Sequence, residues 1–481
     1  MTRDKRKKRK DHATKKAVSK SQKASKQASK AERKDSRHAS KFDDDGDEED
    51  IEILIKQFQE GDRRIGVAEE VACEPPSPRA NASWVAAAGN APFVWLFGGE
   101  HCTGRKVKVY GELFKYRIDK KDWRRINTPV SPPPRSGHQT VVLTNGKLLV
   151  FGGEYTSPSQ NQFHHWKDCW VFDPKELKWE QLDIPTPSAR SGHRMTVWKN
   201  FVVLFGGFYD NYKTTKYHDD LWLFDTTEYK WSKVEFSSLA SKPGPRSGFQ
   251  FITHNDTIYL YGGYCKKQID GDRESGHVYS DMWLLQMSAD PSLITWSLTK
   301  KAGKPPPKRA GCTMIMHKNR GIRFGGVEDN EDDEDVVCRN DMYAFEVEKG
   351  RWFGVTIKSG KAKTDDPVAE LDPAAETPAA IDPSQPHPRY NAMLATYKSQ
   401  LILYGGLFED KKSEHTLDDL WVVNLDKGGP WEVVQRGGWE RGGTSMAALR
   451  EAKTGEETKE GGEEEESGSD SDSSDSSSDE E

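Results

Sequence analysis

The sequence is poor in the features on which metal sites, disulfide frameworks and membrane spans depend. Its six cysteines, in 481 residues, form no C-x-x-C and no paired spacing, which argues against zinc and disulfides and favours a reducing compartment. It contains no run of 18 apolar residues, no apolar segment behind its basic start and no P-loop, G-x-S-x-G or kinase signature. We therefore expect no membrane span, no secretory signal, no catalytic residues, no metal and no cofactor.

Acidic residues are scarce at the N-terminal end and basic residues at the C-terminal end, although the net charge of the whole chain is only −6. Residues 1–41 carry 17 Lys and Arg against 4 Asp and Glu, with a dense cluster at Lys5–Lys10, whereas residues 456–481 carry 13 acids and one Lys. Neither end has the apolar residues to build a core, so both are predicted to be disordered. The basic head favours a nuclear address or an arm that binds RNA or another acidic surface; a solvated solubility tail is the alternative.

The segment from Arg190 to Trp231 contains a unit that recurs. Two apolar runs, Met195–Val197 and Phe201–Phe205, are separated by a tight turn, which predicts two antiparallel strands. A Gly-Gly pair closes the second run, a polar loop follows, and Leu221–Phe224 and Trp231 begin two more strands. Four strands in about forty residues cannot bury both faces alone, so the unit requires neighbours.

Six copies of this unit follow one another. Each has an arginine before its first strand: Arg79, Arg135, Arg190, Arg246, Arg309 and Arg389. Each second strand is predicted to end in a glycine pair: Gly98 and Gly99, Gly152 and Gly153, Gly206 and Gly207, Gly262 and Gly263, Gly325 and Gly326, Gly405 and Gly406. After the pair come an acid and, two residues on, an aromatic, and each unit ends in Trp123, Trp179, Trp231, Trp296, Trp352 or Trp431. This pattern predicts an all-β, six-bladed propeller.

The remaining segments are assigned around the propeller. Ile51, Leu54, Ile55 and Phe58 lie on one face of a short helix, which either packs on the propeller or waits for a partner. The predicted order is a disordered head (1–49), this helix (50–64), the propeller (75–436) with a disordered Pro- and Ala-rich insertion (358–388), and a disordered acidic tail (440–481). How the ring closes is left open.

The long connections all fall on one face of the predicted propeller. The loop between the second and third strands is long in every copy, and the 358–388 insertion joins two blades on that same face. Binding residues concentrate on loops held by a rigid scaffold, so we predict that this face binds a partner. The six arginines are predicted to lie at its centre, where they would bind a carboxylate or phosphate. The alternative is that each arginine pairs with a carboxylate of a neighbouring blade or with a loop carbonyl.

These residues resemble Kelch repeats. The R-S-G-H of Arg135–His138 and Arg190–His193 and the F-G-G of Phe205–Gly207 carry the resemblance. PPSPRANAS from Pro75 and PRYNAML from Pro388, with the basic head and acidic tail, are more similar to one family, Kelch domain-containing protein 4. The resemblance implies an intracellular propeller with no established catalytic activity. It also implies that the arginines contact acidic peptides, most directly where Ser-Gly follows, at Arg135, Arg190 and Arg246.

Three functions are consistent with the sequence. The first is a non-enzymatic, monomeric scaffold for protein partners, an acidic or C-terminal peptide among them. The second is a nuclear or nucleolar factor that binds RNA or ribosomes through its head; a cytoplasmic location also fits. The third is a substrate adaptor for a ubiquitin ligase. In the tail, Ser467, Ser476, Ser477 and Ser478 each have an acid three residues on, which predicts phosphorylation by a kinase of the casein kinase 2 type.

Overall fold

The computed structural model describes residues 51–438, apart from 104–105, 212–213, 271–272, 301, 330–335, 359–383 and 410–412. The basic head, the acidic tail with its four candidate serines and most of the predicted insertion 358–388 therefore lie outside the described residues. Within the described ranges, no helix is long and apolar enough to cross a membrane.

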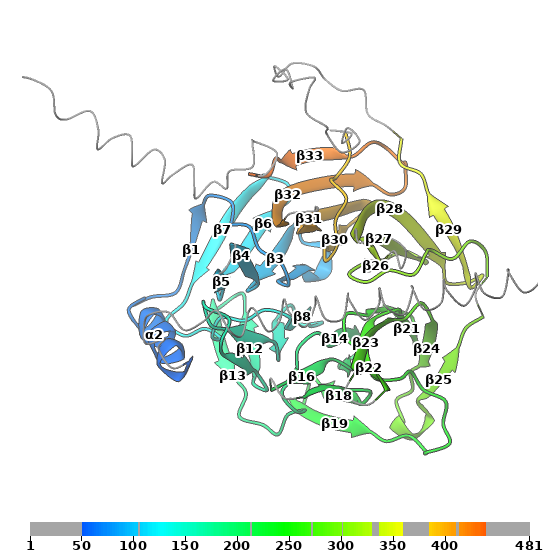
Figure 1. The fold of residues 1–481 in the computed structure, drawn as a ribbon. Helices are drawn as coiled ribbons and strands as arrows, with labels where there is room; N and C mark the ends of the chain where they lie inside the picture. The colour runs from blue at the N-terminus through cyan, green and yellow to red at the C-terminus, as the bar shows by residue number, and fades with distance from the viewer. Residues whose placement is uncertain are drawn as a thin grey trace, which may run out of the picture. The chain divides into compact units, whose positions relative to one another are not determined.

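The chain forms six antiparallel sheets arranged as blades around one axis, which confirms the predicted six-bladed propeller (Figure 1). The inner strands are β2 (Ser83–Ala86), β8 (Gln139–Val142), β14 (Arg194–Trp198), β20 (Gln250–His254), β26 (Thr313–His317) and β30 (Met393–Tyr397). The second strands are β3 (Phe93–Phe97), β9 (Leu148–Phe151), β15 (Phe201–Phe205), β21 (Thr257–Tyr261), β27 (Arg320–Asp329) and β31 (Gln400–Glu409).

The outer half of each blade completes the sheet. The third strands are β6 (Leu113–Arg117), β12 (Cys169–Asp173), β18 (Leu221–Asp225), β24 (Met282–Gln286), β28 (Val336–Glu346) and β32 (Glu414–Asn424). The fourth strands are β7 (Asp122–Asn127), β13 (Lys178–Gln181), β19 (Lys230–Val234), β25 (Thr295–Leu298), β29 (Arg351–Val355) and β33 (Glu432–Gln435). Two short 3₁₀ helices, η1 (Ala88–Asn90) and η2 (Pro291–Leu293), lie in turns of blades 1 and 4.

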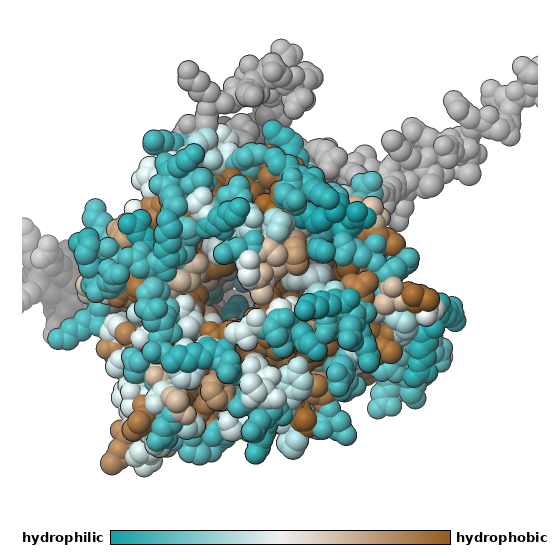
Figure 2. Space-filling view, turned by 180° about the vertical axis from the view of Figure 1, so that it is seen from behind, coloured by the Kyte–Doolittle hydropathy of each residue, from teal (hydrophilic) through white to brown (hydrophobic). Residues whose placement is uncertain are grey.

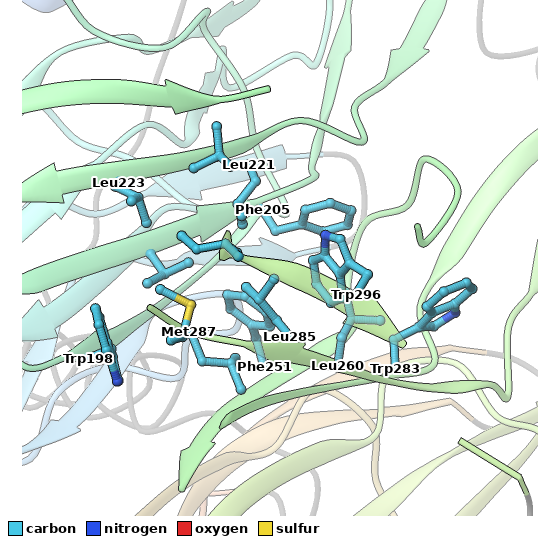
Figure 3. Packing of buried hydrophobic residues seen from close by; sticks show 14 of the residues in the cluster. Trp198, Phe205, Leu221, Leu223, Phe251, Leu260, Trp283, Leu285, Met287 and Trp296 are labelled. Carbon is cyan, nitrogen blue, oxygen red and sulfur yellow. The ribbon is translucent and has the colours of Figure 1, made fainter. Parts of the chain in front are cut away.

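The blades bury their faces against one another. In β15, four of five residues are buried, because the blades on both sides cover a strand in this position. Figure 3 shows the resulting layer between blades 3 and 4, where Phe205 and Leu223 meet Leu260, Leu285 and the ring of Trp296. Full burial of each such side chain contributes about 1.5–3 kcal/mol, so neighbouring blades stabilise each other and no blade is expected to fold alone.

The ring closes without a shared blade, which the sequence left open. Inner strand β2 of blade 1 lies against β30 of blade 6 just as β8 lies against β14. At the outer edge of the same seam, Trp123 Nε1 donates to Gln435 Oε1 at 3.0 Å. The chain also has an outer strand that the sequence did not reveal, β1 (Glu69–Cys73), which pairs with β7 and makes blade 1 five-stranded. This strand belongs to no repeat, so no periodic signal indicated it.

The glycine pairs form the seams between blades. The second glycine donates its N–H to the carbonyl of the arginine that opens the next blade, at 2.9 Å for Gly207 and Arg246. The same bond joins Gly99 to Arg135, Gly153 to Arg190 and Gly326 to Arg389. The first glycine lies so close to this carbonyl that a Cβ on Gly206 would be 2.6 Å from it. Glycine is needed at both positions, because both residues have a positive φ and the backbone of the next blade lies close to them.

The seam between blades 4 and 5 is built differently. There the side chain of Gln250 donates to the carbonyl of Cys312 at 2.6 Å and accepts from the N–H of Met314 at 2.8 Å. The nearby Arg323, on β27, is 1 % exposed, and its three guanidinium nitrogens have no hydrogen-bond partner among the described residues. The equivalent residues, two before the glycine pair, are Leu96, Val150, Leu204, Leu260 and Leu403. Blade 5 thus buries a cation where the other blades bury an aliphatic side chain.

Replacing Gly206 by Ala should destabilise the ring more than the same change at Gly89. Both glycines have nearly the same φ, +66° and +67°, so both variants carry the strain of a left-handed backbone, about 1–2 kcal/mol. Only Gly206 faces a carbonyl; a Cβ on Gly89 would meet nothing within 4 Å. Thermal melting of the two variants measures the difference, and equal melting temperatures would show that the close approach at the seam is unimportant.

Replacing Arg323 by Leu should stabilise the protein. A buried guanidinium without an acceptor costs free energy, and apolar replacement of buried charges can gain about 1–4 kcal/mol. Arg320, exposed on the same strand, is the matched control, and Arg320→Leu should change stability by less than about 0.5 kcal/mol. Melting temperatures of both variants test this, and a lower melting temperature for Arg323→Leu would contradict it.

Candidate partner-binding face

The connection between the second and third strands is a β-hairpin in all six blades, where the sequence predicted loops. Four are separate sheets: β4 (Glu100–Thr103) with β5 (Lys106–Val109), β10 (Glu154–Thr156) with β11 (Phe163–His165), β16 (Phe208–Asp210) with β17 (Thr215–Tyr217), and β22 (Tyr264–Asp270) with β23 (Arg273–Val278). In blades 5 and 6, β27 with β28 and β31 with β32 continue past the glycine pair to form the hairpin. We call the side of the ring that carries them the hairpin face.

The six arginines lie buried beneath the hairpins, not at an open mouth. Arg135 donates to both carboxylate oxygens of Asp168, at 2.7 and 2.9 Å, and to the carbonyls of Pro133 and Gly152. The other five pairs are Arg79–Glu112, Arg190–Asp220, Arg246–Asp281, Arg309–Asp341 and Arg389–Asp419. Each arginine thus pairs with a carboxylate of its own blade and not of a neighbouring blade. The other half of the alternative, a loop carbonyl, is confirmed for Arg135, Arg190, Arg246 and Arg389.

The arginines are at most 5 % exposed, so the predicted placement at the surface is wrong. Direct contact with a partner stays a prediction, and it would require these ion pairs to open. Every unit contains both the arginine and the acid, but their spacing alone does not indicate that they pair. The tryptophan two residues after the acid belongs to the same arrangement, since Trp222 Nε1 donates to Asp220 at 2.8 Å.

Three of the ion pairs hold their carboxylates in the charged form. Burial by itself would raise the pKa of Asp220, but hydrogen bonds and charge from Arg190 outweigh burial, and its pKa falls well below the usual value of 3.8. Asp168 and Asp281 behave in the same way beside their arginines, with their pKa values lowered. Because the folded pKa lies below the unfolded one, each of these three pairs contributes its full stability above about pH 4 and loses it as the pH falls through the folded pKa.

Above the ion pairs, a chain of backbone hydrogen bonds follows the inside of the ring. The second residue after each arginine has a φ between 50° and 63°: Asn81, Gly137, Gly192, Gly248, Gly311 and Asn391. Gly248 donates to Gly192, Gly192 to Gly137 and Gly137 to Asn81, at 2.9–3.0 Å, and Asn391 donates to Gly311 at 2.7 Å. In blades 1 and 6, R-S-G is replaced by R-A-N and R-Y-N. Asparagine can take the place of the glycine there because it tolerates this backbone conformation.

The residue directly after each glycine pair lies at the base of a hairpin and bridges to the residue after the arginine. One such position is present in each blade. Figure 2 shows that the ring has a depression at its centre. We call these six residues the mouth ring: Glu100, Glu154, Phe208, Tyr264, Val327 and Leu407. The mouth ring is acidic in blades 1 and 2, aromatic in blades 3 and 4 and aliphatic in blades 5 and 6. Sequence analysis missed these residues, although each lies between the glycine pair and the acid of its unit, and this fixed position could have revealed them.

Among the residues that the structure describes, no lysine or arginine forms an ion pair with Glu100 or Glu154. Glu100 accepts from Asn81 Nδ2 at 2.6 Å and Ser136 Oγ at 3.0 Å, and burial raises its pKa. Burial, followed by the charge of Glu100, raises the pKa of Glu154 to about 8. His165 Nε2 lies 3.6 Å from Glu154, but burial lowers the pKa of His165 to about 4, so this imidazole is neutral.

The helix α2 (Ile51–Arg63) packs on the hairpins of blades 1 and 2 (Figure 1). Its apolar residues, Ile51, Leu54, Ile55 and Phe58, contact Val107, Val109, Tyr155 and Trp166. The N–H of Ile51 donates to Gln162 Oε1 at 3.1 Å, and a pocket of about 220 Å³ beside the helix is lined by Phe58, Asp62, Lys108 and Arg125. Of the two predicted roles for this helix, the structure shows packing on the propeller.

The ring of six blades, with its buried arginines and glycine pairs, defines a Kelch-type propeller. Residues 67–263 match the family model described as the KLHDC2/KLHL20/DRC7 Kelch-repeats domain. The solved structure of YjhT covers 75 % of this chain and 99 % of its own, with a TM-score of 0.51 and 16 % identity, which shows the fold alone.

Curated relatives carry similar repeats. The leucine-zipper-like transcriptional regulator 1 homolog of Drosophila melanogaster is 24 % identical over 54 % of this chain. The host cell factor homolog hcf-1 of Caenorhabditis elegans is 28 % identical over 65 %, and Kelch repeat-containing protein 2 of Saccharomyces cerevisiae is 27 % identical over 47 %. The chain spans 25 %, 37 % and 24 % of their respective lengths. The narrower resemblance to the Kelch domain-containing protein 4 family is not carried by these relatives and stays a prediction.

Replacing Arg190 by Ala should destabilise the fold by about 3–5 kcal/mol, because Asp220 then remains buried without its partner. The matched control is Lys199→Ala, which breaks an exposed pair with Asp256 and should cost no more than about 1 kcal/mol. Melting curves at pH 7 and pH 3 test both variants. The difference between wild type and Arg190→Ala should shrink at pH 3, and equal losses for the two variants at pH 7 would show that the buried pair does not hold the blade.

Proposed function

We propose that the chain is a non-enzymatic interaction scaffold that binds a segment of a partner protein on its hairpin face. The observation that carries this proposal is the division of each repeat into constant and variable positions. The arginines and tryptophans recur and are buried, whereas the mouth ring differs from blade to blade. Variable side chains on a rigid ring suit the recognition of one particular partner.

The hairpins add a physical reason for choosing this face. Each hairpin is held at its base by a backbone bridge between the residue after the glycine pair and the residue after the arginine. Side chains on the hairpins are therefore pre-organised, and binding loses less conformational entropy than it would on free loops. Exposed aromatic residues on this face, Phe163 at 42 % and Tyr209 at 38 %, offer the kind of side chain that anchors protein interfaces.

A second candidate function rests on the charge of the head. The excess of 17 basic over 4 acidic residues in 1–41 favours binding to RNA or another acidic surface and an address in the nucleus, including the nucleolus. Phosphorylation of the four tail serines would add negative charge that competes for the same head. Adaptor activity for a ubiquitin ligase is a further alternative, in which the hairpin face would select the substrate.

Affinity capture from cell lysate should lose its protein partners when Phe208 and Tyr264 are both replaced by Ala. The mouth ring would lose its two aromatic side chains. The affinity for the partner is expected to fall by about tenfold or more, as it does when a pair of anchor residues is removed. Quantitative mass spectrometry measures the captured proteins, with and without nuclease.

The matched control replaces two exposed apolar residues of blade 4 that belong to no hairpin. Leu293→Ala and Leu298→Ala remove side chains that are 62 % and 58 % exposed, and they should leave capture unchanged. Capture that survives the Phe208 and Tyr264 changes but falls with nuclease, or after removal of residues 1–41, would favour the RNA-side function over the proposed scaffold.

A further inference from the structure

Aromatic rings form a continuous strip across three neighbouring hairpins. His165 on β11 packs against Phe208 at 5.7 Å and Tyr209 at 5.0 Å between ring centroids. Phe208 packs against Tyr217 at 5.9 Å, and Tyr217 against Tyr264 of the next blade at 6.4 Å. Of these rings, only His165 is fully buried, so the strip is a surface and not part of the core.

The blade 1 and 2 end of the strip is acidic. Glu154 lies on the hairpin that carries His165, and Glu100 lies on the hairpin before it. After burial, the charge of Glu100 raises the pKa of Glu154 most. The hydrogen bond from Ser191 lowers this pKa, and the charge of Asp210 raises it. The charge of Glu414 raises the pKa of Glu100. No lysine or arginine of the described residues forms an ion pair with Glu100 or Glu154.

The hydrogen bonds of His165 keep it from acting as the missing cation. Its Nδ1 lies 2.8 Å from Ser191 Oγ, and its Nε2 accepts from the backbone N–H of Asp210 at 3.1 Å. An Nε2 that accepts carries no proton, so the ring is the neutral tautomer with its proton on Nδ1. The groups that face Glu154 are therefore the carboxyl groups of Glu100 and Asp210, the neutral imidazole of His165 and the hydroxyl of Ser191.

Aromatic faces beside carboxylates suit one ligand chemistry. A guanidinium or ammonium is attracted to the face of an aromatic ring by about 0.5–2 kcal/mol, and a carboxylate adds a charge-assisted hydrogen bond. A phosphate or an acidic peptide would be repelled at the same place. The acidic partner expected from the sequence depended on six free arginines, but each of these is paired with a carboxylate of its own blade.

We propose that the mouth formed by the aromatic strip with Glu100 and Glu154 binds an arginine or lysine side chain in a basic segment of a protein partner. This inference rests on the proposed function, since it names the chemistry of the partner that the hairpin face recognises. The cation stacks on the rings of Phe208 and Tyr217 and pairs with Glu154. Glu154 is largely protonated in the free protein at neutral pH, so binding releases a proton and the affinity rises with pH between about 6.5 and 9.

The test measures binding of two labelled peptides to the full-length chain by fluorescence anisotropy at 150 mM salt. One peptide is ten residues of Gly and Ser with four arginines, and the other has glutamates in place of the arginines. The arginine peptide should bind, and Glu154→Gln should weaken it by about 10- to 100-fold, since a charged hydrogen bond is lost. Gln imitates the neutral carboxyl group, so the melting temperature should not change.

A control is needed because the acidic tail also attracts a basic peptide. Glu228→Gln removes an exposed carboxylate in a turn on the opposite face of blade 3 and should leave the affinity unchanged. The weakening caused by Glu154→Gln, compared with this control, reports the mouth alone. Phe208→Ala should weaken the same peptide by about fivefold, as expected for a lost cation–π contact of about 1 kcal/mol.

The inference is overturned if Glu154→Gln binds the arginine peptide as tightly as Glu228→Gln does, or if the glutamate peptide binds more tightly than the arginine peptide. Either result leaves the proposed function standing, provided that the Phe208 and Tyr264 double variant still loses its captured partners. Failure of both experiments would remove the hairpin face as a binding surface altogether.

Discussion

The ring depends on one arginine in each blade, because its side chain and its backbone act in two directions. The guanidinium of Arg246 pairs with Asp281 of its own blade, while its carbonyl accepts from Gly207 of the blade before. Burying this guanidinium is tolerable only because both carboxylate oxygens and two carbonyls accept from it. The blade and the seam therefore share one residue, which explains why arginine and glycine pair recur together.

Departures from this rule gather at the seam between blades 4 and 5. There the Gln250 side chain makes two hydrogen bonds to blade 5, and Arg323 lies buried without an acceptor among the described residues. Among the described residues, the bond from the second glycine to the arginine carbonyl joins four of the six seams, so the ring also contains seams that are built differently. The stability of this propeller is therefore unevenly distributed around its axis.

Sequence reasoning could predict what the repeat imposes and little else. The six blades followed from spacing, because a blade cannot bury its faces alone, but the glycine pairs were predicted only to end the second strands, and β27 and β31 run through them. The arginines were identified correctly but placed wrongly: nothing in the spacing of Arg190 and Asp220 says that the chain folds back to join them. Strand β1 and the bridge through Gln250 belong to no repeat, and the hairpins, predicted as loops, depend on bridges to residues of a separate segment.

Because the six arginines are paired, other residues determine the charge of the hairpin face. If the six guanidiniums were free, every Kelch-type blade of this kind would present a cation at the centre, whatever its other residues. Because each is paired with a carboxylate of its own blade, the constant positions contribute no net charge there. The sign and shape of the mouth are then set by residues such as Glu154 and Phe208, which directly follow the glycine pair and differ from blade to blade. The same architecture can thus keep its ring intact while the chemistry of its mouth changes freely.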